Sequence, residues 1–385
     1  MSQSEAPNDS TWEAFRREMP VSENLAYFDH AAVAPISGPA QRALSQWAEQ
    51  SAKIGETAWP QWSRRLEEVR QSAATMVSAD AEEIGLVRNT TEGIGIVAEG
   101  YPWQIGDNVV VPADEFPSNL YPWLNLASRG VETRQIPPAE TGGIDLQAVA
   151  DACDERTRIV AASWVGYAGG WRSDVAELAQ VAHDAGALFF LDAIQGLGVF
   201  PLDVRQTNID FFAADGHKWM LGPEGAGLLY MRREHLDLLR PFGVGWNSVR
   251  HAREFNRIEL DYRPTVERYE GGSQNMPGFH ALGASLDLLA SIGTERLAAR
   301  LIELTDQLCE RLTTLGATII SRREGERRSG IVSFTLPDVD PNQVQKHCMS
   351  EGVVLSCRAG RLRVSPHGYT SNSDLDRLFA ALASA

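Results

Sequence analysis

An alternation of short apolar runs with helix-type patterns, from about residue 60 to residue 232, is the feature that most limits the fold of this chain. Most of the segments between the runs repeat apolar residues every three to four positions, as residues 174–183 do. Strands that alternate with helices predict an α/β fold, in which helices cover both faces of a mostly parallel sheet. The expected strands are Ile84–Val87, Asn108–Val111, Val131–Ile136, Arg158–Val165, Leu188–Leu191, Asp210–Ala213 and Gly227–Met231.

The pattern changes after about residue 264. Longer helices are expected over residues 277–291 and 294–315, and strand-like runs follow at 331–336 and 362–365. This order of elements predicts a smaller α+β domain.

The length of the chain also favours two domains. Its 385 residues exceed the roughly 250–300 residues at which a single hydrophobic core stops growing. We expect a large domain over residues 26–263 and a small C-terminal domain over 264–385. The N-terminal segment, residues 1–25, is expected to pack on the small domain.

The charge of the chain argues against polyanionic partners. It has 35 Lys and Arg against 51 Asp and Glu, a formal net charge of −16 that repels nucleic acid and anionic lipid surfaces. No apolar run has the length of a signal peptide or of a membrane span. The four cysteines form no CxxC pair and no metal-ligand set is evident, so we expect a cytoplasmic protein without a metal site.

Ligands of open α/β sheets bind at the carboxyl ends of the strands, so the residues after each expected strand matter most. Residues 88–93, Arg-Asn-Thr-Thr-Glu-Gly, open a helix whose free N–H groups can hold an anion. A plain helix cap at Asn89 or Thr90 is the alternative. Gly93 and Gly95 also match a dinucleotide-binding pattern, but they fall inside the expected helix rather than in the turn before it, which argues against that ligand.

A carboxylate and a lysine follow two further apolar runs. Asp192 comes directly after Leu188–Leu191, and a buried carboxylate needs a cationic partner, either an Arg or Lys or a protonated ring nitrogen of a cofactor. Lys218 follows the next run, with His217 and Trp219 beside it. A desolvated lysine of this kind forms Schiff bases, although a solvated loop lysine fits the motif equally well.

An anion cradle, a buried carboxylate and a Schiff-base lysine are together the three anchors that pyridoxal phosphate requires. In the order of its motifs the chain resembles the class V aminotransferase family of fold-type I enzymes, which includes cysteine desulfurases, selenocysteine lyases and isopenicillin N epimerases. The resemblance implies a mostly parallel, mixed seven-stranded sheet and pyridoxal 5'-phosphate as cofactor. The motifs are residues 27–32 (Tyr-Phe-Asp-His-Ala-Ala), 89–93 (Asn-Thr-Thr-Glu-Gly), 192–195 (Asp-Ala-Ile-Gln), 217–218 (His-Lys) and 361–366 (Arg-Leu-Arg-Val-Ser-Pro).

The resemblance implies a role for each motif residue. Lys218 is expected to bind the cofactor aldehyde and to move the Cα proton, Asp192 to face the ring nitrogen, and Arg363 to take the substrate carboxylate as a bidentate pair. Phe116 stands where relatives place the residue that stacks on the cofactor ring. The other expected contacts are Gln195 at the ring hydroxyl, Thr90, Thr91, Asp215 and His217 around the phosphate, and Ser273 from the partner subunit of a homodimer.

Four positions depart from the family pattern. Phe116 replaces a His that is thought to move protons in cysteine desulfurases. Cys357 lies six residues before Arg363 and not on the mobile loop that carries their nucleophilic cysteine, so we expect it to be structural. Asp215 replaces a phosphate-binding Ser and would repel a phosphate unless it turns away, and Trp164 replaces an Asn near the ring hydroxyl. Contact of these last two residues with the cofactor stays open.

These features predict an enzyme that acts at Cα of an amino acid as a small-molecule substrate, in the first place an aminotransferase. The alternatives are a cysteine desulfurase-like or other β-lyase, an epimerase of the isopenicillin N epimerase type, and a non-catalytic protein that binds the cofactor. The reactions differ in where a carbanion is reprotonated or what it loses, which depends on the shape of the pocket. Sulfur transfer to a protein acceptor is disfavoured by Phe116 and Cys357.

Overall fold

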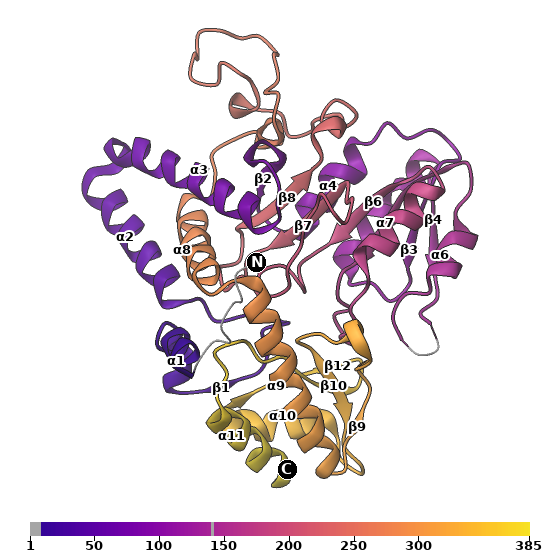
Figure 1. The fold of residues 1–385 in the computed structure, drawn as a ribbon. Helices are drawn as coiled ribbons and strands as arrows, with labels where there is room; N and C mark the ends of the chain where they lie inside the picture. The colour runs from indigo at the N-terminus through magenta and orange to yellow at the C-terminus, as the bar shows by residue number, and fades with distance from the viewer. Residues whose placement is uncertain (1–8, 140–141) are drawn as a thin grey trace, which may run out of the picture.

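A central seven-stranded sheet organises the larger part of the computed structural model, which describes residues 9–139 and 142–385 (Figure 1). The strand order is β2-β8-β7-β6-β5-β3-β4, in which β8 runs antiparallel to both of its neighbours and the other pairs are parallel. The predicted mixed α/β sheet is therefore confirmed. The strands are β2 (Ile84–Val87), β3 (Asn108–Pro112), β4 (Glu132–Ile136), β5 (Thr157–Ser163), β6 (Leu188–Asp192), β7 (Phe211–Asp215) and β8 (Gly227–Met231).

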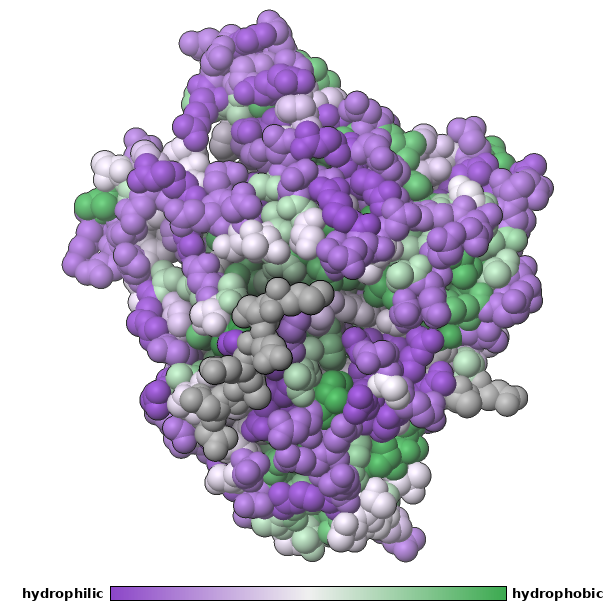
Figure 2. All heavy atoms as spheres, viewed as in Figure 1, coloured by the Kyte–Doolittle hydropathy of each residue, from purple (hydrophilic) through white to green (hydrophobic). Residues whose placement is uncertain are grey.

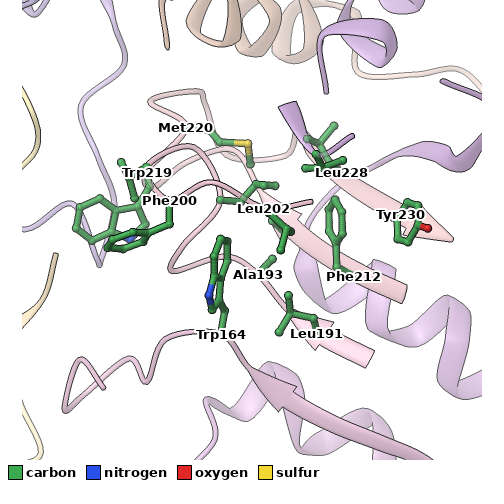
Figure 3. Packing of buried hydrophobic residues seen from close by; sticks show 14 of the residues in the cluster. Trp164, Leu191, Ala193, Phe200, Leu202, Phe212, Trp219, Met220, Leu228 and Tyr230 are labelled. Atoms are coloured by element: carbon green, nitrogen blue, oxygen red, sulfur yellow. The ribbon is translucent and has the colours of Figure 1, made fainter. Parts of the chain in front are cut away.

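Except for the edge strand β4, the strands are mainly apolar runs because the sheet is buried on both faces. Along β5, Val160 and Ala162 belong to one hydrophobic core, whereas Ile159 and Ala161 belong to a second core on the opposite face. Figure 3 shows part of the first core, where large aromatic side chains such as that of Phe212 fill the space beside the sheet.

Helices cover both faces of this sheet. Helix α8 packs against α2 and α3, and all three lie beside the β2 edge of the sheet (Figure 1). Helix α2 starts at a serine cap, since the Ser37 hydroxyl accepts the Ala40 N–H at 3.2 Å. The helices of this part are α2 (Gly38–Ile54), α3 (Trp59–Met76), α4 (Thr90–Gly100), α5 (Tyr121–Leu124), α6 (Leu146–Ala152), α7 (Val175–Asp184) and α8 (Met276–Ile292).

A smaller α+β unit forms the lower part of Figure 1. Its antiparallel sheet has the order β12-β13-β10-β9, and a third core joins Leu304 and Leu308 of α9 to Phe334 of β10 and Leu362 of β13. The elements are α9 (Thr294–Thr314), β9 (Thr318–Ile319), β10 (Val332–Thr335), α10 (Pro341–Ser350), β11 (Val353–Val354), β12 (Ser356–Arg358), β13 (Arg361–Val364) and α11 (Asn372–Ala383).

The N-terminal segment contacts the C-terminal part of the chain. Arg16 of α1 (Asp9–Arg17) donates to Asp374 at 3.1 Å, and β1 (Ala26–Tyr27) pairs in parallel with β11. Residues 1–8 of the predicted segment lie outside the described residues. The division of the chain at residues 25 and 263 stays a prediction, and the packing of α8 on α2 and α3 places that helix with the large sheet.

Within residues 9–139 and 142–385, no helix is both long and apolar enough to cross a membrane. The face shown in Figure 2 is mainly hydrophilic, with small apolar areas scattered over it. Location in the cytoplasm stays a prediction.

Candidate active site

A cavity of about 360 Å³ lies at the carboxyl ends of β2, β6 and β7, where the sequence predicted a ligand. Its volume is in the range of small-molecule sites. The structure brings nine of the ten predicted site residues together here: Thr90, Thr91, Phe116, Asp192, Gln195, Asp215, His217, Lys218 and Arg363.

The start of α4 forms one end of the cavity. Asn89 caps the helix by accepting the Glu92 N–H at 2.9 Å, so Asn89 and not Thr90 is the cap. The Thr90 hydroxyl accepts the Asp215 N–H at 3.0 Å and ties the helix to β7. The Thr91 hydroxyl donates to that of Ser118 at 2.9 Å. Hydroxyl groups at a helix N-terminus suit the phosphate of the cofactor.

Asp192 is a buried carboxylate without a protein cation. It is 2% exposed, accepts the Ile194 N–H at 3.1 Å, and makes no ion pair within 4.0 Å among the residues that the structure describes. Burial raises its pKa to about 6, against the opposing hydrogen bond from Ile194 and the charge of Lys218. A protonated ring nitrogen of a cofactor would supply the missing positive charge, so this site fits pyridoxal phosphate.

Lys218 is also buried, with an exposure of 8%. Burial lowers its pKa to about 8, although the charge of Asp192 opposes the shift. Its Nζ lies 5.5 Å from the centre of the Phe116 ring, which is 43% exposed and meets Tyr167 edge to face at 5.3 Å. A desolvated amine can react with an aldehyde, and the accessible aromatic ring next to it can stack on a flat ring that carries the aldehyde.

Asp215 is turned toward its own loop. Its carboxylate accepts the Gly216 N–H at 2.7 Å, and its Oδ2 lies 2.9 Å from Nδ1 of His217. The contact with His217 is not an aligned hydrogen bond. A carboxylate held in this way is partly compensated, which lessens the repulsion that the sequence led us to expect.

Gln195 lines the cavity, whereas Trp164 belongs to the first hydrophobic core. The Gln195 amide donates to the Ala31 carbonyl at 3.0 Å and accepts from Trp219 at 2.8 Å, so its orientation is fixed at the cavity. Trp164 is 3% exposed, packs against Phe200 in the first core (Figure 3) and does not line the cavity. Trp164 therefore does not replace the Asn of the relatives as a cofactor contact.

Three hydrogen bonds fix the position of the Arg363 guanidinium. Its guanidinium donates to Asp29 at 3.0 Å, to the Ser356 hydroxyl at 3.2 Å and to the Tyr167 carbonyl at 2.7 Å. One N–H on each of Nη1 and Nη2 is left for another partner, which is the number that a bidentate carboxylate needs. Burial lowers the pKa of Arg363, and the charge of Asp29 opposes that shift.

The cavity contains no thiol. All four cysteines lie in the described part of the chain, and none of them lines the cavity. Cys357 sits between Ser356, which contacts Arg363, and Arg358, which lines the cavity. Because neighbouring strand residues point to opposite faces, the Cys357 side chain turns away from the site.

Ser273 is the predicted site residue that lies elsewhere. It lines a second cavity of about 520 Å³, together with Trp59, Arg253 and Glu270. The expected contribution of Ser273 to the phosphate site of a partner subunit stays a prediction.

Three polar residues of the cavity had no role in the sequence analysis: Ser118, Tyr167 and Arg358. Ser118 and Tyr167 follow β3 and β5, so the search at strand ends could have included them. Arg358 reaches the cavity through the turn between β12 and β13, and no motif marks it.

Comparisons with known proteins agree with this geometry. A model of the family described as Aminotransferase class-V matches residues 26–378. A probable cysteine desulfurase of Methanothermobacter thermautotrophicus is 33% identical over 95% of this chain and 96% of its own length. The cysteine desulfurase of Pectobacterium atrosepticum is also 33% identical, over 93% of this chain and 92% of its own.

Among solved structures, the apo cysteine desulfurase of Thermococcus onnurineus NA1 superposes with a TM-score of 0.88 at 26% identity. The match covers 100% of this chain and 99% of that one. The dinucleotide-binding alternative is excluded, because Gly93 and Gly95 lie inside α4 and the family model spans the whole sheet. The chain belongs to the class V aminotransferases, a family of fold-type I pyridoxal-phosphate enzymes.

Proposed function

We propose that this protein is a pyridoxal-phosphate-dependent lyase that cleaves the Cβ–S bond of a cysteine-type amino acid and releases the sulfur as a free thiol. One observation carries the proposal. The cavity holds a lysine, a buried carboxylate and an anchored arginine, but no cysteine that could accept sulfur. The relatives named cysteine desulfurase support cysteine as the parent substrate.

Each cavity residue has a part in this reaction. Arg363 binds the α-carboxylate through its free N–H groups and fixes the orientation of Cα. Lys218, with a pKa of about 8, has a neutral amine available near neutral pH and accepts the Cα proton at Nζ. Asp192 holds positive charge on the ring nitrogen. The bound cofactor supplies the ring that withdraws the electron pair left by the Cα–H bond.

The remaining residues of the cavity would hold the cofactor in place. Thr91, His217 and the start of α4 would hold the phosphate, with Thr90 and Asp215 fixing that end of the sheet. Phe116 would stack on the ring, and Gln195, whose amide has a second N–H, would donate to the ring hydroxyl. Ser273 of the partner would complete the phosphate site of a homodimer.

The cofactor attachment is tested first. Purified protein mixed with pyridoxal phosphate should give a visible absorbance band, and borohydride should trap the cofactor on Lys218. The Lys218→Ala protein should give no trapped adduct. An adduct of equal yield in that variant would overturn the assignment of Lys218.

The reaction type is tested with a panel of amino acids. We expect pyruvate without an added keto acid, together with hydrogen sulfide from L-cysteine and a thiol from S-alkyl cysteines. Transamination, the first choice from the sequence, requires a keto-acid acceptor, and epimerisation returns the enantiomer. Keto acid formed only when an acceptor is added would replace the lyase by an aminotransferase.

A cysteine variant separates the lyase from a desulfurase that forms a protein persulfide. Because the Cys357 side chain turns away from the cavity, Cys357→Ser should keep the wild-type rate. A loss of about 100-fold or more, with alanine rather than pyruvate as the wild-type product, would show sulfur transfer to the protein instead.

A further inference from the structure

The hairpin of β12 and β13 places three arginines on one face. Its two-residue turn has Ala359 and Gly360 at φ values of 50° and 73°, both left-handed, as a tight hairpin requires. In the antiparallel register Ser356 lies opposite Arg363, and Arg358 lies opposite Arg361. Residues opposite each other or two apart share a face, so Arg358, Arg361 and Arg363 all lie on the side of Ser356.

The charge of this face is poorly balanced. Asp29 pairs with Arg363 at 3.0 Å. Among the residues that the structure describes, neither Arg358 nor Arg361 has a carboxylate within 4.0 Å, and the one hydrogen bond of the Arg358 side chain goes to the Cys357 carbonyl at 3.1 Å. Like charges directly opposite each other on two strands are destabilising. In a chain with a net charge of −16, this pair of arginines is an unusual arrangement.

Arg358 lines the active-site cavity, whereas Arg361 does not. The positive charge of Arg358 acts on Lys218 and Arg363 in this cavity. Burial lowers the pKa of Lys218 and of Arg363, and the positive charge of Arg358 lowers both further. Arg358 and Arg363 are diagonal neighbours on the hairpin, about 7–8 Å apart at the backbone. Two cations at this spacing suit two anionic groups on one small molecule.

We propose that Arg358 binds an anionic group at the far end of the substrate, opposite the α-carboxylate that Arg363 binds. Resting on the proposed lyase function, this makes the substrate class a cysteine thioether whose sulfur substituent carries a carboxylate. The hairpin then replaces the loop that carries the nucleophilic cysteine in desulfurases with a site that selects the substituent.

The reaction on such a substrate is balanced. Lys218 takes the Cα proton, the Cβ–S bond breaks, and the sulfur leaves with the bonding electron pair as a thiolate, which is then protonated. The three-carbon remainder takes up one water and leaves as pyruvate and ammonium. No oxidant or reductant is needed.

Two nearly isosteric substrates test the proposal, S-carboxymethyl-L-cysteine and its neutral amide, S-carbamoylmethyl-L-cysteine. The measured quantity is the ratio of their kcat/KM values for pyruvate formation. We expect the wild type to favour the carboxylate by roughly 10- to 100-fold, the range for a hydrogen bond between charged groups. Arg358→Gln should bring the ratio to about one, and Arg358→Lys should keep part of it.

Arg361→Gln is the matched control, since it removes the same charge from the same face of the hairpin but not from the cavity. It should keep the wild-type ratio. Calorimetric binding of both compounds to the cofactor-loaded Lys218→Ala protein, which cannot turn them over, should show the same preference and the same loss in the double variant Lys218→Ala/Arg358→Gln.

The outcomes separate the two proposals. A wild-type ratio near one, with pyruvate formed from both compounds, would overturn the role of Arg358 and leave the lyase intact. An equal loss in Arg361→Gln would replace a direct contact by a general effect of charge and also overturn it. If no cysteine derivative yields pyruvate, the lyase function fails, and the calorimetric preference alone then decides the role of Arg358.

Discussion

Lys218 and Asp192 show how strongly burial controls the chemistry of single residues. Neither makes an ion pair with a protein group within 4.0 Å in the described part of the chain. Both are buried, with exposures of 8% for Lys218 and 2% for Asp192. Burial lowers the pKa of the amine to about 8 and raises that of the carboxylate to about 6. Both pKa shifts increase the fraction of each side chain that is neutral at physiological pH.

The first prediction concerns the pH dependence of cofactor binding. Only a neutral amine attacks an aldehyde, and an amine with a pKa of about 8 gains that form as the pH rises through 8. The rate at which cofactor-free protein develops the absorbance band should therefore rise from pH 6.5, reach half of its maximum near pH 8 and level off above about pH 9. An ordinary lysine would level off only above pH 10.

Asp192→Asn is the control for this measurement. The charge of Asp192 opposes the lowering of the Lys218 pKa, so its removal should move the midpoint to lower pH. A wild-type midpoint near 10.5, or a shift to higher pH in the variant, would contradict the role of burial at this lysine.

Residues that follow predicted strands could be found from the sequence. Asp192 and Lys218 come after apolar runs long enough to be recognised as buried strands, and the carboxyl ends of such strands meet at one edge. Asp29 and Arg358 could not be found in this way: Asp29 meets the site through an ion pair with the distant residue Arg363, and Arg358 ends a three-residue hairpin strand that no pattern marked. The sequence also left the direction of the Trp164 side chain open, since the direction of a side chain just past a strand end depends on the turn.

At the scale of elements, the packing of α4 on β7 depends on Gly93. A Cβ atom at this position would lie 2.6 Å from the Cβ of Ala213, so the helix can approach the strand only without a side chain. This contact, rather than a dinucleotide, explains the glycine that the sequence analysis singled out. It also sets the position of the helix start at the cavity.

The second prediction compares two glycines of the same helix. Gly93→Ala and Gly95→Ala gain the same helix propensity, but a Cβ at Gly95 has no atom within 4 Å. Overpacking should make Gly93→Ala less stable than Gly95→Ala by about 1–3 kcal/mol, seen as a lower melting temperature. Gly93→Ala should also bind the cofactor more weakly. Equal melting temperatures would show that α4 can move away from β7 at no cost.

Apart from the partly exposed edge strand β4, the strands of the large sheet were predictable because both of their faces are buried. The two-residue strands β1, β9 and β11 were not, since so short a segment carries no periodicity. The order of the strands was also out of reach, because it is decided by pairings between segments far apart in the chain.

For the whole molecule, the remaining question is assembly. The segment between β8 and α8 projects from the body in Figure 1 and carries exposed apolar side chains. They are Phe242, Val244, Trp246, Phe255, Ile258 and Leu260. Exposed apolar groups that gather on one projection mark a contact with another molecule. A second copy of the chain is the partner expected from the resemblance to the family.

The third prediction is therefore a homodimer, with a mass in sedimentation of twice 42.2 kDa. The double variant Ile258→Asp/Leu260→Asp should shift the protein toward monomer and weaken cofactor binding, because Ser273 is then not supplied by a partner. Ile105→Asp is the control, since Ile105 is 85% exposed on another loop. A monomeric wild type that binds the cofactor tightly would contradict both the dimer and the role of Ser273.

The ion pair between Asp29 and Arg363 joins residues that are 334 positions apart. A ribosome that adds about 5–20 residues per second therefore releases the first partner roughly 20–70 s before the second. During that interval β1 has no strand to pair with, and the carboxylate-binding site does not exist. The growing chain can form its large sheet early, but it becomes an enzyme only after its last segment has left the ribosome.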